Sequence, residues 1–335
     1  MKKTILILIS LAVVLSVLGG CGDNRRAAAR DTDGRISVIT TNFPPFDFVR
    51  VIAGDRVNLS MLLPPGSESH SFEPSPRDII NIQNSDVFIY IGGETDAWVG
   101  RLLRSMDTDA MNILAMLEVV EALEEEIVEG MEAPHRHHDD HHDDHHDDDD
   151  DDDDHHHDEI VLDEHVWTSP KNAVLLVRAI TELLCELDAA NAYFFRQNAA
   201  AYIEELRELD AAFEELVAAA RRRTIVFGDR FPFRYFAYDY GLEYFAAFPG
   251  CSTETEPSAA TVAFLINKIR AERIPVVFHI ELSNERMADT ISGETGARKL
   301  LLHGAHNITR NDFNAGLSYL RIMRGNLANL REALY

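Results

Sequence analysis

"NAYFFRQNAAAYIEELRELDAAFEELVAAARRR", residues 191–223, is the stretch that decides the fold. Its apolar residues recur at three- and four-residue spacing, and it runs for 33 residues without glycine or proline, which predicts one long helix. At ~1.5 Å per residue such a helix would extend roughly 50 Å, far enough to pass from one domain to another. We therefore expect two domains, one on each side of this helix in the sequence.

The flanking segments alternate between short apolar runs and helical patterns. Before the long helix we expect strands at 36–41, 57–63, 87–93 and 111–116, and helices at 44–54, 75–86, 94–106 and 169–188. After it we expect strands at 224–228, 244–248, 275–281 and 300–304, a helix ending at Tyr240, and helices at 258–273, 285–296 and 312–334. This alternation favours parallel sheets with helices on both faces. The predicted fold is α/β, with two open α/β lobes, each containing a mostly parallel sheet, joined by a long connecting helix.

The N-terminus has the pattern of an export signal. Lys2 and Lys3 precede an apolar stretch over 5–18, which is too short for a confident membrane span, and small residues follow. The sequence LGGC, ending at Cys21, resembles the bacterial lipobox, and this resemblance implies a lipid on that cysteine. We predict a signal peptide over 1–20, a lipidated tether over 21–33, and a mature protein anchored outside the cytoplasmic membrane. A soluble export signal is the alternative.

"HRHHDDHHDDHHDDDDDDDDHHHD", residues 135–158, holds ten of the fifteen histidines together with thirteen aspartates. With its single arginine it supplies −12 of the formal net charge of −26, a charge that excludes nucleic acid as a partner and suits cations. So much like charge resists folding, and we predict a disordered loop. Neutral imidazole binds zinc well, so the adjacent histidines predict weak metal binding. They are His137, His138, His141, His142, His145, His146, His155, His156 and His157. An acidic loop that only aids solubility is the alternative.

These patterns divide the mature chain. We assign 34–134 to the first lobe, which resumes after the tract over 159–190, and 224–335 to the second lobe. Two cysteines remain in these lobes. Export permits a disulfide between Cys185 and Cys251, but Cys185 lies in an apolar helical pattern and would also suit a buried apolar position.

Five histidines lie outside the tract: His70, His165, His279, His303 and His306. His70 follows a predicted strand in the loop PGSESHSFEPSP (65–76), and His165 precedes a predicted helix in DEHVWTSP (163–170). Ligand sites of open α/β sheets gather at the carboxyl ends of strands. Both positions therefore suit a binding site.

Several motifs in order along the chain carry a resemblance. The two loops around His70 and His165, the acidic histidine-rich tract, the long helix, EPSAATVAFLI (256–266) and YLRIMRGNLANLREAL (319–334) resemble the metal-binding lipoproteins of bacterial ABC transporters for zinc and manganese. The tract resembles that of the zinc-uptake branch. The resemblance implies a monomeric substrate-binding protein without enzymatic activity, which holds a divalent ion between its lobes and delivers it to a permease.

The resemblance also implies metal ligands. His70 and His165 match the ligands of the first lobe. The family usually supplies another histidine after the first strand of the second lobe, but VFGDRFPFRYF (226–236) contains none. We predict Asp229 in its place, because the guanidinium of Arg230 has no acceptor. Glu281 fits the carboxylate that the family supplies after a later strand. The alternatives for this lobe are His279, His303 and His306.

The predicted ligands leave the identity of the metal open. Imidazole suits zinc, and added carboxylates make manganese acceptable. The histidine tract favours zinc, so we predict high-affinity zinc capture, with manganese uptake as the nearest alternative. A surface adhesin or metal buffer and a secreted zinc hydrolase are further alternatives. The hydrolase is disfavoured because the sequence has neither an HExxH motif nor a nucleophile elbow.

Overall fold

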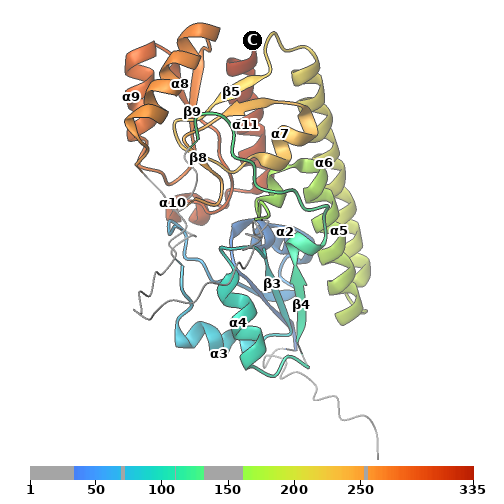
Figure 1. The fold of residues 1–335 in the computed structure, drawn as a ribbon. Coiled ribbons are helices and arrows are strands. Elements are labelled where there is room, and N and C mark those ends of the chain that lie inside the picture. Colours follow the sequence, from blue (N-terminus) through green and yellow to red (C-terminus); the bar gives the residue numbers. More distant parts are fainter. Residues whose placement is uncertain (1–33, 69–71, 110, 132–160, 253–255) are drawn as a thin grey trace, which may run out of the picture.

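The computed structural model describes residues 34–68, 72–109, 111–131, 161–252 and 256–335. The predicted signal peptide and tether, Cys21, His70 and the histidine–aspartate tract lie outside the described residues. Two α/β lobes stand one above the other, with long helices running along one side of both (Figure 1). The predicted fold class is confirmed. Among the residues described, no helix has the length and apolar character needed to cross a membrane.

The first lobe is built on a four-stranded parallel sheet. Its strands are β1 (Ile36–Thr40), β2 (Val57–Met61), β3 (Val87–Tyr90) and β4 (Asn112–Ala115), in the order β2-β1-β3-β4. Its helices are α2 (Phe43–Ala53), α3 (Pro76–Gln83), α4 (Ala97–Ser105) and α5 (Pro170–Leu187). Val38 at the centre of β1 pairs with Leu59 and Val87 and is fully buried. The nearly continuous apolar run of β1 therefore reflects a strand covered on both faces.

The second lobe repeats this strand order. Its main strands are β5 (Thr224–Val226), β7 (Glu243–Phe245), β9 (Val276–His279) and β10 (Arg298–Leu301). β5 pairs with β7, β9 pairs with β10, and a parallel bridge between Phe227 and Phe278 joins the two pairs. The order is thus β7-β5-β9-β10, in which the first strand lies between the second and the third, as in the first lobe. The helices are α7 (Arg234–Tyr240), α8 (Ala259–Glu272) and α9 (Arg286–Thr295).

The structure departs from the predicted elements at three places. A short parallel pair, β6 (Arg230–Phe231) with β8 (Phe248–Pro249), was not predicted. The single helix expected over 312–334 is divided into α10 (Arg310–Asn314) and α11 (Tyr319–Leu334), because Gly316 lies between them at a φ of 71°. The long helix α6 (Ala192–Ala218) has 27 residues and is about 40 Å long. The domain boundaries that we drew around it stay predictions.

Hydrogen bonds around Trp167 hold the lobes together. Trp167 lies in a short 3-10 helix (Val166–Thr168) and is fully buried. Its indole Nε1 donates to the carbonyl oxygen of Gly304 at 2.7 Å, and Tyr319 donates its hydroxyl to the Trp167 carbonyl at 2.6 Å. The backbone N–H of Tyr319 donates in turn to Asp47 of α2 at 2.7 Å. One cluster of buried apolar side chains also extends through both lobes, so the lobes share a continuous core.

The segment 119–131, assigned by sequence to the first lobe, reaches the second one. Tyr235 of α7 accepts a hydrogen bond from the backbone N–H of Leu123 at 3.1 Å and donates its hydroxyl to the carbonyl oxygen of Asp163 at 2.7 Å. The backbone N–H of Cys251 donates to Glu125 at 2.8 Å. The described residues on both sides of the tract are therefore attached to the second lobe.

Cys185 and Cys251 are both buried free thiols. The disulfide that the sequence left open is not formed. Cys185 lies on the buried face of α5, in agreement with its place in an apolar helical pattern.

Asp96 gives the first lobe a pH-dependent stability. Its carboxylate is 5% exposed and accepts backbone hydrogen bonds from Ile91 at 2.7 Å and Gly92 at 3.3 Å. Burial outweighs these bonds and raises the pKa of Asp96 to about 6. The folded protein therefore holds a proton between pH 4 and 6 that the unfolded chain has lost, and its stability falls as the pH rises through this window.

We predict that Asp96→Asn removes this dependence. Between pH 4 and 7 the variant should gain about 3 kcal/mol of unfolding free energy relative to the parent, the amount that corresponds to the raised pKa. Urea denaturation of both proteins at the two pH values measures the difference. A difference that does not change with pH would contradict the assignment.

Candidate metal centre

The carboxyl ends of the strands in the two lobes face a common cleft. Asp229 follows β5, Glu281 follows β9, and the loop 302–309 follows β10. From the first lobe, the loop after β2 enters the cleft, together with His165 at the start of its 3-10 helix. In open α/β sheets this crevice is the usual place for a ligand.

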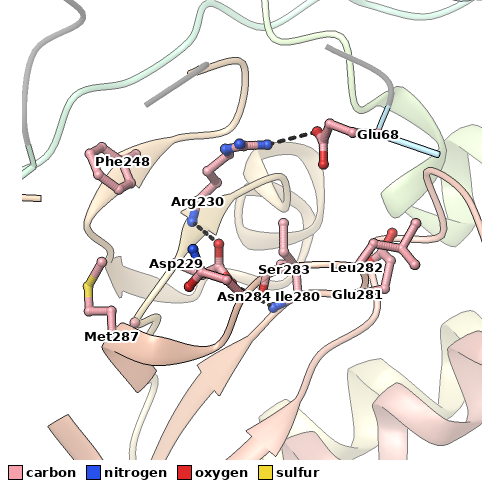
Figure 2. A pocket seen from close by; sticks show the side chains of 11 residues that line it. Glu68, Asp229, Arg230, Phe248, Ile280, Glu281, Leu282, Ser283, Asn284 and Met287 are labelled. Carbon is pink, nitrogen blue, oxygen red and sulfur yellow. Dashed lines mark hydrogen bonds and ion pairs between the residues drawn. The ribbon is translucent and has the colours of Figure 1, made fainter. Parts of the chain in front are cut away.

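Two adjoining cavities lie in the cleft, and a third, of about 10 Å³, is also lined by His306. The smaller of the two adjoining cavities has a volume of about 30 Å³, which is room for an ion or a water molecule. It is lined by Ser67, Glu68, His165, Arg230, Pro232, Gly250, Ile280, Glu281, Leu282, His306 and Asn307. The larger, of about 210 Å³, is shown in Figure 2. It is lined by Glu68, Gly228, Asp229, Arg230, Phe248, Ile280, Glu281, Leu282, Ser283, Asn284 and Met287.

The structure brings His165 and His306 together at the smaller cavity. Their ring centroids are 5.3 Å apart and the rings are nearly perpendicular, at 86°. His165 precedes α5, whereas His306 comes from the loop after β10. Trp167 packs against both rings, with centroid distances of 5.5 Å and 5.0 Å. His306 had been predicted only as an alternative ligand, and its signal was its place at a strand end in LLLHGAHN.

Asp163 orients His165. One oxygen of this buried carboxylate accepts the backbone N–H of His165 at 2.8 Å and lies 3.1 Å from Nδ1 of its ring. A proton on Nδ1 leaves Nε2 as the nitrogen available to a metal, an arrangement common around metal-binding histidines. Sequence reasoning missed this role, although Asp163 stands only two residues before the histidine.

Burial and charge act in opposite directions on His165. Burial lowers the pKa of the imidazole, but Asp163, Glu164 and Glu125 raise it by more, so the pKa lies above its ordinary value. Gly250 also packs closely against the imidazole ring of His165. A Cβ added at this glycine would lie 3.1 Å from Nδ1 of His165 and 2.8 Å from the carbonyl oxygen of Phe231.

Glu281, a predicted ligand, holds the loop that carries His306. One of its oxygens accepts the N–H of Gly304 at 2.6 Å and the other accepts the N–H of His306 at 2.9 Å. Ala305, between these two residues, has a φ of 59°, in the left-handed region. A non-glycine residue in this region is uncommon. The two hydrogen bonds stabilise this tight turn and fix the backbone of His306.

Asp229, the other carboxylate predicted as a ligand, faces the larger cavity and does not line the smaller one. One oxygen accepts the N–H of Arg230 at 2.9 Å and the other accepts the N–H of Ile280 at 3.3 Å. Burial raises the pKa of Asp229. Among the residues that the structure describes, Asp229 is therefore not brought to the cavity that His165 and His306 share.

The other alternative histidines lie elsewhere. Nδ1 of His279 is 3.1 Å from the carbonyl oxygen of Ile280, and Nδ1 of His303 accepts the N–H of Ala305 at 3.0 Å. Neither residue lines either cavity. Within the described ranges no group of three or more His, Cys, Asp or Glu side chains is arranged to hold a metal. The predicted ligand His70 lies outside those ranges, two residues beyond Glu68.

Comparison with known proteins gives relatives along the whole chain. The chain is 31% identical over 335 residues to the zinc-binding lipoprotein AdcA of Streptococcus pneumoniae, an alignment that covers 99% of this chain and 61% of that protein. It is 29% identical over 325 residues to the high-affinity zinc uptake system protein ZnuA of Bacillus subtilis, with 97% and 96% of the two chains covered. The chain thus spans about three fifths of the length of its streptococcal relatives.

Solved structures agree with the fold. The Zn(II)-bound ZnuA-like domain of Streptococcus pneumoniae AdcA has a TM-score of 0.70 at 29% identity, covering 90% of this chain and 99% of that one. The metal-dependent lipoprotein YcdH of Bacillus subtilis has a TM-score of 0.72 at 26% identity, with 90% and 100% covered. The laminin-binding protein of Streptococcus agalactiae, at 22% identity, shows likeness of fold alone. A family model described as zinc-uptake complex component A, periplasmic, matches residues 38–333, and the chain belongs to this ZnuA family.

Proposed function

We propose that this protein captures Zn²⁺ between its two lobes, outside the cytoplasmic membrane, and delivers it to the permease of an ABC transporter. The observation that carries the proposal is the meeting of His165 and His306 at one ion-sized cavity. The names of its relatives support it, since AdcA is described as a zinc-binding lipoprotein and ZnuA as a high-affinity zinc uptake protein.

We further propose His70, His165 and His306 as the zinc ligands. Glu68, two residues before His70, already lines the cavity with His165 and His306. Three imidazoles with an open fourth position are a common zinc environment. The backbone hydrogen bonds to both oxygens of Glu281 and of Asp229 favour a supporting role for these carboxylates over direct coordination.

The donor set favours zinc over manganese. Manganese prefers oxygen ligands in octahedral sites, whereas imidazole suits zinc. The hydrogen bonds around Trp167 and the Asp163–His165 contact hold two of the imidazoles before any metal arrives. A site held in this way loses little conformational entropy on binding, which supports tight capture.

The family supports a proposal for the location and partners of this protein. We propose that Cys21 carries the lipid, because the relative AdcA is a lipoprotein and LGGC resembles a lipobox. The partner is a permease that takes the ion from a monomeric binding protein. The family is that of a component of a zinc-uptake complex, which supports transport rather than hydrolysis.

His70→Ala, His165→Ala and His306→Ala should each weaken the tight zinc site by at least about tenfold, or roughly 1.4 kcal/mol, because each removes one ligand. Equilibrium titration against a competing chelator, with zinc and with manganese, measures the effect. If a variant binds zinc as tightly as the parent, the substituted histidine is not a ligand. If the parent binds manganese more tightly than zinc, manganese is favoured as the transported metal.

His279→Ala is the matched control for this series. His279 ends β9 in the same lobe as His306 but lines neither cavity. The variant should bind zinc like the parent. A loss equal to that of His306→Ala would show that the assay reports general damage to the second lobe.

Asp163→Asn should weaken zinc binding by about 10- to 100-fold, the usual effect of losing a partner that orients a metal-binding histidine. The amide of the new asparagine can donate a hydrogen bond to Nδ1 of His165. The asparagine therefore no longer favours the tautomer with the proton on Nδ1, which leaves Nε2 free to bind the metal. The exposed Asp289→Asn serves as the control, since Asp289 lies on α9 and pairs with Lys299. Unchanged zinc affinity in Asp163→Asn would rule out the orienting role.

Deletion of residues 135–158 should remove weak zinc equivalents and leave the tight site nearly intact. Ten histidines lie in that stretch. Because the sequence predicts that it is disordered, zinc binding there must offset the entropy lost when the segment becomes ordered. Calorimetric titration of the parent and of the deleted protein counts both classes of site. Loss of the tight site, or an unchanged number of weak ones, would refute this division.

A further inference from the structure

A positively charged side chain, that of Arg230, lines the cavity that is proposed to hold zinc. Arg230 lines the smaller cavity with His165 and His306, and its side chain is only 11% exposed. Figure 2 shows its guanidinium directed at Glu68, and the two are joined by an ion pair of 3.0 Å. The pair links β6 of the second lobe to the loop after β2 of the first.

The ion pair is not the main attachment of that loop. Asn307 donates its side-chain amide to the carbonyl oxygens of Pro64 at 2.8 Å and Ser67 at 2.9 Å. The N–H of Gly66 donates to the carbonyl oxygen of Ile308 at 2.8 Å. These three bonds fasten the loop to the second lobe next to His306. Loss of the Glu68–Arg230 pair therefore leaves these three attachments of the loop in place.

The charges of this pair act on a bound metal with opposite signs. The positive guanidinium repels a divalent cation in the same cavity, and the repulsion is stronger than in open solvent because the Arg230 side chain is only 11% exposed. Arginine stays protonated at any working pH and cannot relieve it. The carboxylate of Glu68, which lines the same cavity, attracts the cation and offsets most of the repulsion.

We propose that the Glu68–Arg230 pair sets the zinc affinity of this protein, with Arg230 weakening binding and speeding release, and Glu68 offsetting it. The inference rests on the proposed zinc-binding function. An uptake protein must give up its ion to its partner, and a fixed repulsive charge beside preorganised imidazoles limits how long the ion stays.

The test compares Arg230→Gln, Glu68→Gln and the double variant in the mature protein. Arg230→Gln should bind zinc about tenfold more tightly and release it more slowly, and Glu68→Gln should bind it about tenfold more weakly. The double variant restores the net charge and should return to within about threefold of the parent. Chelator competition gives the affinity, and stopped-flow transfer of zinc to excess chelator gives the release rate.

Two further variants separate charge from packing. Arg230→Lys keeps the positive charge and should lie closer to the parent in zinc affinity than Arg230→Gln does. Arg298→Gln removes an arginine of a similar ion pair, 2.8 Å from Glu332 on the exposed side of the same lobe, and should change nothing. Added salt should bring Glu68→Gln and Arg230→Gln closer to each other in affinity, since screening weakens both effects. Where Arg230→Gln folds poorly, the loss of affinity in Glu68→Gln and its recovery in the double variant still test the proposal.

The outcomes are distinguishable. If Arg230→Gln and Glu68→Gln both weaken binding, the pair is a mechanical link between the lobes and the proposal is overturned. Equal affinities of all variants would overturn it as well. If the parent itself has no tight zinc site, the proposed function fails, whatever the variants do.

Discussion

The hydrogen bond from Trp167 to Gly304 is the contact on which both the lobe arrangement and the site depend. It crosses from the segment before α5 to the loop after β10 at 2.7 Å, inside a fully buried environment. The same indole packs against His165 and His306. The spacing of these two imidazoles is therefore set by the side chain that also joins the lobes. A relative movement of the lobes would leave a buried N–H and a buried carbonyl without partners, which is costly.

The similar strand order of the two lobes explains why the residues of the candidate site lie between them. In each sheet the first strand lies between the second and the third, so the crevice at its carboxyl end opens toward the other lobe. The acidic residues Glu68, Asp229 and Glu281 line that crevice, and burial raises the pKa of Glu164, next to His165, to about 7. Glu164 is held there by the backbone N–H of Thr95 at 3.2 Å. Buried acids next to His165 cost folding energy, and they favour a cation in the cleft.

The sequence was sufficient for most of the architecture because the longer helices and strands had local signals. The β1 strand, the long helix and the parallel sheets were all predictable from apolar spacing. The pair β6–β8 was not, because strands of two residues have no periodicity. The break before α11 depends on Gly316 at a positive φ, which a glycine permits but does not require.

The site was less predictable because ligand choice depends on loop conformation. Asp229 and Glu281 stand at strand ends, as ligands do, yet both carboxylates accept hydrogen bonds from nearby backbone amides. The backbone conformation of nearby loops, such as the turn at Ala305, decides whether a carboxylate coordinates a metal or accepts hydrogen bonds from its own loop. Residue type alone does not reveal this conformation. The contact of the segment 119–131 with α7 was missed for a similar reason, since it joins residues far apart in sequence.

On the proposed function, the affinity for zinc and the rate of its release depend on different parts of the cleft. The imidazoles are held by Trp167, Asp163 and Glu281, whose hydrogen bonds are made before an ion arrives, so these residues act on the entropy lost in binding. On the further inference, Arg230 and Glu68 act through their charges, and their ion pair joins the two lobes beside the imidazoles. Because the two effects rest on separate side chains, a change in the charged pair alters how long an ion stays without disturbing the geometry that selects it. The departure from the family pattern at Asp229 and Arg230 is thus compatible with a selective zinc site.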